Sequence, residues 1–104
     1  MPKFTLAPLA ETDLKAIWNY ISEYNEDSAN KFIRDISKKF ELLAQNNQIG
    51  RRRDDFIIEM RVFPFKKYYI YYFPNEEGVE IYRVLHGSRD IESEFEDYFE
   101  GLKE

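Results

Sequence analysis

The period of the hydrophobic pattern changes near the middle of the chain, and this change restricts the fold more than any other feature of the sequence. Before about residue 45, apolar residues recur every three or four positions, which is typical of amphipathic helices. From Phe56 to Leu85 the pattern instead alternates, or consists of β-branched and aromatic residues that favour strands. A helical first half followed by a stranded second half predicts an α+β fold.

The first half predicts a short strand followed by two helices. Phe4 and Leu6 suit a strand that ends before Pro8, because a residue without an N–H is tolerated in the first turn of a helix. The first helix has one apolar stripe, formed by Ala10, Leu14, Ile17, Trp18 and Ile21. After a break at residues 25–27, the second helix has another, formed by Ala29, Phe32, Ile33, Ile36, Phe40 and Leu43.

Residues at both ends of the second helix predict where it begins and where it ends. Asp27 or Ser28 is the expected cap, since either side chain can accept a hydrogen bond from the free amides of the first turn. Gly50 follows a polar turn, ends the helix and is free to take a left-handed backbone conformation. The short break between the helices predicts an antiparallel hairpin.

The second half predicts three antiparallel strands and a last helix. The strands are expected at residues 56–63, 66–73 and 79–85, with a hairpin loop at 74–78. The last helix is indicated by a further apolar stripe, formed by Ile91, Phe95, Tyr98, Phe99 and Leu102. With the first strand beside a later one, we expect a helical hairpin packed on one face of a mostly antiparallel four-stranded sheet, followed by an amphipathic C-terminal helix.

Length and composition limit the domain count and the chemistry. The chain has 104 residues and a mass of 12.6 kDa, so residues 1–104 are expected to form a single domain. It contains no cysteine and one histidine, and we therefore expect neither a metal site nor a cofactor. No stretch of about 18 apolar residues occurs, so the sequence predicts no secretory signal and no membrane span. The expected location is the cytoplasm.

Charge is distributed unevenly along the chain. The formal net charge is -5 and the pI is about 5.0, which disfavours a protein that binds a phosphate backbone. Residues 51–89 carry 8 basic and 6 acidic side chains, whereas residues 90–104 carry 1 and 7. Within the basic segment, the run Arg51–Arg53 precedes Asp54 and Asp55, and we expect a loop that neutralises itself.

Patterns of several enzyme classes are missing from the sequence. It has no nucleophile elbow with serine, histidine and aspartate in order, no glycine-rich phosphate loop, and no helix with two metal ligands. The segments Arg61–Phe65 and Arg83–Asp90 instead resemble the RelE/ParE superfamily of bacterial toxins, and more closely its ParE branch. The resemblance extends over Ala10–Ile21, Ala29, Phe32, Gly50–Arg51 and Tyr69–Tyr72.

The resemblance implies the toxin of a type II toxin–antitoxin system. Such a toxin is held inactive in a hetero-oligomer with an antitoxin of the ParD kind, encoded beside it, whose disordered C-terminal segment would fold along the toxin surface. ParE-like members are regarded as inhibitors of DNA gyrase that block replication, arrest growth and stabilise plasmids. They require no enzymatic turnover and no direct, sequence-specific binding of nucleic acid.

RelE-like members of the superfamily instead cut mRNA in the ribosome. That reaction needs a base, an acid and cations but no metal, and here Glu59 or His86 is a candidate base and Arg89 a candidate cation. By alignment, however, the arginine that such nucleases carry on a strand falls at Tyr69, and the tyrosine of their last helix falls at Phe95. Gyrase inhibition is therefore the preferred interpretation. The alternatives are RNA cleavage and an antitoxin-binding module without toxicity.

The candidates for contact with the target are Arg61, Arg83, His86 and Arg89. If their strands are neighbours in the sheet, we expect Arg61 and Arg83 to lie close together on one face, where two guanidinium groups in one groove would suit an anionic partner. Each candidate also has a structural interpretation, such as an ion pair for an arginine or a hydrogen bond for His86 at the end of its strand. The C-terminal helix is expected to cap the sheet permanently.

Overall fold

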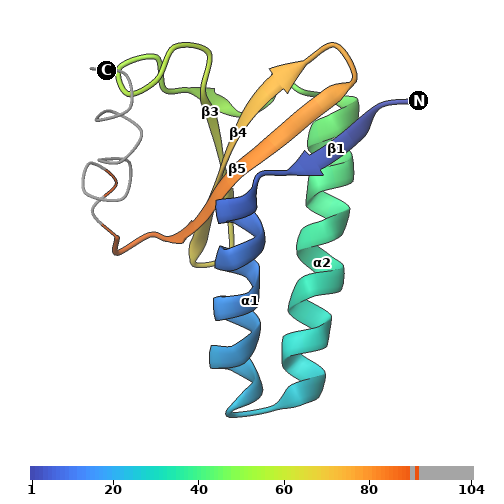
Figure 1. Cartoon of the computed structure of the whole chain (residues 1–104), viewed down its shortest axis with the longest axis vertical. Helices are drawn as coiled ribbons and strands as arrows, with labels where there is room; N and C mark the ends of the chain where they lie inside the picture. Colours follow the sequence, from blue (N-terminus) through green and yellow to red (C-terminus); the bar gives the residue numbers. More distant parts are fainter. Residues whose placement is uncertain (90, 92–104) are drawn as a thin grey trace.

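The computed structural model describes residues 1–89 and 91, and it has the α+β architecture that the sequence predicts. Helices α1 (Pro8–Ser22) and α2 (Glu26–Gln45) form an antiparallel hairpin beside the sheet (Figure 1). The strands are β1 (Lys3–Leu6), β2 (Arg51–Arg52), β3 (Arg61–Phe65), β4 (Tyr68–Asn75) and β5 (Gly78–His86). The predicted C-terminal helix falls on residues outside the described part of the chain, Ile91 excepted.

The sheet has the strand order β1-β5-β4-β3-β2. β1 runs parallel to β5, and all other neighbours are antiparallel, so the first strand does lie beside a later one. The predicted number of four strands is one too low. The additional strand, β2, is only two residues long and belongs to the arginine run, where the sequence shows no alternation.

Both helices begin near the expected positions. Pro8 is the first residue of α1, as predicted. The cap of α2 is Asn25, whose side-chain oxygen accepts a hydrogen bond from the Ser28 amide at 2.9 Å. The prediction of Asp27 or Ser28 as cap is therefore wrong, and both residues lie in the first turn of α2. In the described part of the chain, no helix has the length and apolar character needed to cross a membrane.

Hydrophobic residues cover both faces of the sheet. The main core lies between the sheet and the helices and includes Ile36, Phe40 and Leu43 of α2. A smaller cluster on the other side consists of Ile57, Met60, Tyr71 and Leu85. The second cluster explains why the predicted strand at residues 56–63 is wrong in its first half. Residues 56–60 form turns that bury two apolar side chains, and the strand begins only at Arg61.

Gly50 has a different role from the one predicted. Its backbone is not left-handed; positive φ angles occur in the described residues at Glu59, Lys66 and Gly78. The Gly50 amide donates a hydrogen bond to the Tyr72 hydroxyl at 2.8 Å, and that hydroxyl donates to the Asn47 carbonyl at 3.1 Å. A Cβ atom at position 50 would lie 2.7 Å from Cε1 of Tyr72. Glycine is required there because the tyrosine ring approaches the backbone closely.

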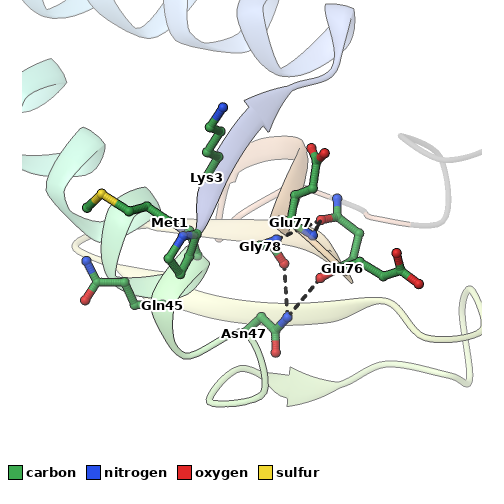
Figure 2. A pocket seen from close by; sticks show the side chains of 10 residues that line it. Met1, Lys3, Gln45, Asn47, Glu76, Glu77 and Gly78 are labelled. Carbon is green, nitrogen blue, oxygen red and sulfur yellow. Dashed lines mark hydrogen bonds between the residues drawn. The ribbon is translucent and has the colours of Figure 1, made fainter.

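The β4–β5 hairpin is tighter than the predicted five-residue loop. β4 continues through Asn75, and only Glu76 and Glu77 form the turn. Figure 2 shows the side-chain amide of Asn47, in the loop after α2, donating to the backbone carbonyl of Gly78 at 3.0 Å. This contact connects the loop after α2 to the start of β5.

Candidate functional site

Three of the four predicted target-binding residues line one open hollow of about 480 Å³ between α1 and the end of β5. Its lining residues come from three parts of the chain: Asp13, Ala16, Ile17 and Tyr20 of α1, Lys67 and Tyr68 at the start of β4, and Arg83, Val84, Leu85, His86, Ser88 and Arg89 of β5 and the turn after it. We call it the α1–β5 hollow. A larger hollow, of about 640 Å³, surrounds the residues in Figure 2 and contains none of the predicted site residues.

Arg83 is held by an ion pair at the inner end of the α1–β5 hollow. Its Nε lies 2.8 Å from Oδ2 of Asp13 and its Nη2 lies 2.9 Å from Oδ1, so the contact is bidentate. The two side chains are only 10% and 12% exposed. Oδ2 of Asp13 also accepts from the Val84 amide at 3.0 Å, which satisfies a backbone group at the edge of β5. Arg83 therefore has a structural partner that is 70 residues away in sequence.

His86 is oriented by the turn that follows β5. Its Nδ1 atom lies 2.7 Å from the Ser88 hydroxyl and accepts a hydrogen bond from the Ser88 amide at 3.1 Å. Because a backbone N–H can only donate, we assign the proton of the neutral ring to Nε2. The ring also meets Tyr68 edge to face, with 5.4 Å between centroids. In this arrangement Nε2 of His86 is an N–H donor, and the lone pair of Nδ1 already accepts a hydrogen bond from Ser88.

Positive charge predominates around the α1–β5 hollow. Lys67, Arg83 and Arg89 are cationic, and Asp13 is the one carboxylate among the described residues that line it. Asp13 pairs with Arg83, so the four charged residues of the lining sum to a positive charge. The local charge is thus opposite in sign to the net charge of the chain, which is -5.

Arg61 lies elsewhere, because β4 separates its strand from β5 and the condition for its approach to Arg83 is not met. The β3–β4 register sets Arg61 opposite Tyr72, whereas the β4–β5 register sets Arg83 opposite Tyr71. Paired residues share a sheet face, and the successive residues Tyr71 and Tyr72 of β4 point to opposite faces. The Cβ atoms of the two arginines therefore lie on opposite faces of the sheet. Nη1 of Arg61 donates to the carbonyls of Gln48 at 2.9 Å and of Gly50 at 2.7 Å. Arg61 therefore fastens the segment before β2 to β3.

The three residues considered for RNA cleavage do not form one group. Glu59 lines a separate small hollow with Arg61, whereas His86 and Arg89 line the α1–β5 hollow. Tyr69, at the position aligned with the nuclease arginine, is 42% exposed. Phe95 lies outside the described residues. A base, an acid and a cation acting on one phosphate would have to lie within reach of the same atoms, and these candidates are split between two hollows.

The basic run before β3 neutralises much of its own charge, as predicted. Arg52 binds Asp54 through two hydrogen bonds of 2.6 and 2.9 Å, and Arg53 binds Asp55 in the same way at 3.0 and 2.9 Å. The Arg52 guanidinium, helped by the Glu59 amide, lowers the pKa of Asp54 to about 2. These exposed pairs order the loop, and we assign them no role in binding.

Comparison with known proteins agrees with this architecture. The family described as ParE toxin of type II toxin-antitoxin system, parDE, matches residues 4–91. "Toxin ParE1" of Mycobacterium tuberculosis, found in two strains, is 26% identical over 92 residues, which cover 86% of this chain and 94% of that protein. Among solved structures, the chromosomal ParDE TA system from P. aeruginosa has a similar fold, with a TM-score of 0.68, 20% identity, and coverage of 83% of this chain and 96% of the other. Because the family match covers most of the sequence, the chain belongs to the ParE toxin family of type II toxin–antitoxin systems.

Proposed function

We propose that this protein is a cytoplasmic toxin that inhibits DNA gyrase and so blocks replication, and that a ParD-like antitoxin neutralises it by forming a hetero-oligomer. The family match over residues 4–91 carries the proposal. Inhibition by binding requires a stable surface for a macromolecule and does not require an assembled set of catalytic groups.

The α1–β5 hollow is the part of the surface that we assign to target contact. His86 and Arg89 are the proposed contacts, because both line the hollow. Arg83 is proposed as a positioning residue, since its guanidinium is engaged by Asp13. Arg61 is no longer part of the proposed site, because it lines a different hollow and donates to two backbone carbonyls.

The same geometry supports binding over RNA cleavage. Glu59 lies apart from His86 and Arg89, and Nδ1 of His86 already accepts from Ser88. A net charge of -5 is also unfavourable for entering the RNA of a ribosome.

The direct test is a supercoiling assay with purified gyrase and relaxed plasmid. We expect the toxin to reduce supercoiling, and the antitoxin encoded beside it to restore supercoiling when added in equal amount. Primer extension on translated mRNA should show no new cuts. Unchanged supercoiling at saturating toxin would contradict the proposal, and new cuts in the mRNA would support the nuclease alternative.

A matched pair of variants tests the assigned surface. Arg89→Ala should weaken gyrase inhibition by about tenfold, the effect of losing one charge-assisted hydrogen bond at an interface. Arg34→Ala removes the same charge from an exposed position on α2 and should leave inhibition unchanged. Circular dichroism of both variants checks that the fold is intact.

A further inference from the structure

The loop between β2 and β3, residues 53–60, is closed by hydrogen bonds within its own backbone. The Arg53 amide donates to the Met60 carbonyl at 2.7 Å. The Arg53 carbonyl accepts from the amides of Phe56 at 3.0 Å and of Ile57 at 3.1 Å, and the Met60 amide donates to the Ile57 carbonyl at 3.0 Å. Because these bonds satisfy much of its backbone, the loop is expected to keep one conformation in solution.

Side chains anchor the same loop to the sheet. Ile57 and Met60 are buried, and both belong to the smaller core cluster on the sheet face opposite the helices. The Arg53 guanidinium lies 4.8 Å from the centroid of the Phe56 ring, a distance typical of a cation–π contact. The loop is therefore packed against the sheet and does not stand free of it.

The tip of the loop holds an apolar side chain in solvent. Ile58 is 77% exposed, more than any other leucine or isoleucine in the described part of the chain. The next residue, Glu59, has a φ of 70°, which is unfavourable for a residue with a Cβ atom, and the Asp54 carboxylate accepts from its amide at 2.8 Å. A single exposed apolar side chain is common on protein surfaces. Here, however, a strained backbone conformation adjoins it, and such strain is often found at functional sites.

The cationic side chains beside the tip are already paired. Arg52 makes two hydrogen bonds to Asp54. Arg53 makes two to Asp55. A nucleic acid would need unpaired cations, whereas an apolar centre within a polar rim is the usual composition of a contact between proteins. Ile58 therefore suits a protein partner, and its branched side chain loses little entropy when it is buried.

The shape of the tip indicates which kind of protein it fits. A protruding side chain on an ordered loop requires a partner with a pocket that is already formed. A disordered segment that folds on binding, as the resemblance implies for the antitoxin, instead places its own side chains into grooves of the toxin. The loop therefore favours a folded target over the antitoxin.

We propose that the tip of the 53–60 loop is a second contact with the folded protein target of this toxin, in which Ile58 enters an apolar pocket of the target. Glu59 is a positioning residue, because its backbone sets the direction of the tip. The inference rests on the proposed function in one respect, that the target is a protein. It adds a contact on the sheet face opposite the helices, apart from the α1–β5 hollow.

Shortening Ile58 in the full-length chain tests this contact in the supercoiling assay. Ile58→Ala should raise the toxin concentration needed for half-inhibition of gyrase by about tenfold or more, because most of the buried side chain is lost. Ile58→Val removes one carbon and should raise it by about fourfold at most. Leu42→Ala shortens another exposed aliphatic side chain, on α2, and should leave inhibition unchanged. The melting temperature of Ile58→Ala should equal that of the wild type, since the side chain is exposed.

Growth arrest on expression without antitoxin gives a second measurement that does not depend on gyrase. Ile58→Asp should abolish the arrest, with its fold checked by circular dichroism. Loss of arrest in this variant, together with no inhibition of gyrase by the wild type, would support the inference and reject the proposed gyrase target alone. If the wild type inhibits gyrase but Ile58→Ala and Ile58→Asp retain full inhibition and full arrest, the inference alone is rejected. A wild type that does not arrest growth would reject both.

Binding of the antitoxin distinguishes the two protein partners. Calorimetric titration of the antitoxin encoded beside the toxin should give the same affinity for the wild type and for Ile58→Asp. A tenfold loss of that affinity in Ile58→Asp would assign the tip to the antitoxin and would overturn the inference.

Discussion

Replacing Asp13 with alanine should destabilise this protein more than any exposed charge change. The Asp13 carboxylate accepts three hydrogen bonds, two from Arg83 and one from the Val84 amide. Both partners of the ion pair are nearly buried. Truncating one partner of a buried pair leaves the other charge desolvated and costs about 3–5 kcal/mol.

The expected loss is a large part of the total stability. The free energy of unfolding of a natural domain is about 5–15 kcal/mol. For a chain of this length, a loss of 1 kcal/mol lowers the melting temperature by about 4–8 °C. Asp13→Ala should therefore lower the melting temperature by about 12–40 °C. Urea unfolding followed by circular dichroism at neutral pH gives the free energy directly, and the slope with urea shows whether unfolding remains two-state.

Two comparisons show whether the loss of stability comes from breaking the buried ion pair or from removing any carboxylate. Asp35→Ala breaks an ion pair with Lys31, whose side chain is 65% exposed, and should cost about 0–1 kcal/mol. Combining Asp13→Ala with Arg83→Met removes both charges and should recover part of the loss, because no desolvated guanidinium remains. A loss below about 1 kcal/mol for Asp13→Ala, or a double variant no more stable than the single one, would refute the reasoning.

Three further changes probe other parts of the fold. Gly50→Ala should cost about 1–3 kcal/mol in urea unfolding, because its methyl group meets the buried Tyr72 ring, whereas the methyl group of Gly87→Ala comes closest to the half-exposed Tyr69 ring, 3.1 Å from its Cε2 atom, and should cost less. The pKa of Asp54, measured by carbon-13 NMR, should be about 2, and a value near 3.8 would contradict this prediction. The stability that its ion pair contributes is therefore present above pH 4 and is lost as the pH falls towards 2. Glu59→Gly should leave the stability unchanged or raise it by up to about 1 kcal/mol, since the φ of Glu59 is 70°, and a clear loss would argue against strain there.

Helical periodicity made the first half of the fold predictable. The apolar stripes of α1 and α2 persist over about three and four turns, and Pro8 fixes the first boundary. The placement of β1 beside a later strand also follows, because a short strand with exposed edges needs a partner. Local signals of this kind do not depend on how distant segments pack.

Some of the errors are local, and others concern contacts between distant segments. Asn25 and Ser28 are both good capping residues, and their order in the helix decides which one caps. Residues 56–60 alternate like a strand, but burial against Tyr71 and Leu85 favours turns. Arg83 shares sequence parity with Val79 and Ile81, yet the register irregularity between Ile81 and Arg83 breaks the alternation of β5 and sets Arg83 opposite Tyr71. No pattern within either strand contains that register.

The unequal lengths of β1 and β5 explain why the α1–β5 hollow exists. β1 has four residues and β5 has nine, so β1 pairs with β5 only from Gly78 to Ile81. Beyond that point the edge of β5 would expose backbone groups, which proteins normally cover. Asp13 covers one of them from α1, and the remaining space between helix and strand is the hollow. Its walls are therefore a helix and a strand joined by a buried ion pair, so a partner would bind a surface that is already formed and would lose little free energy in ordering it.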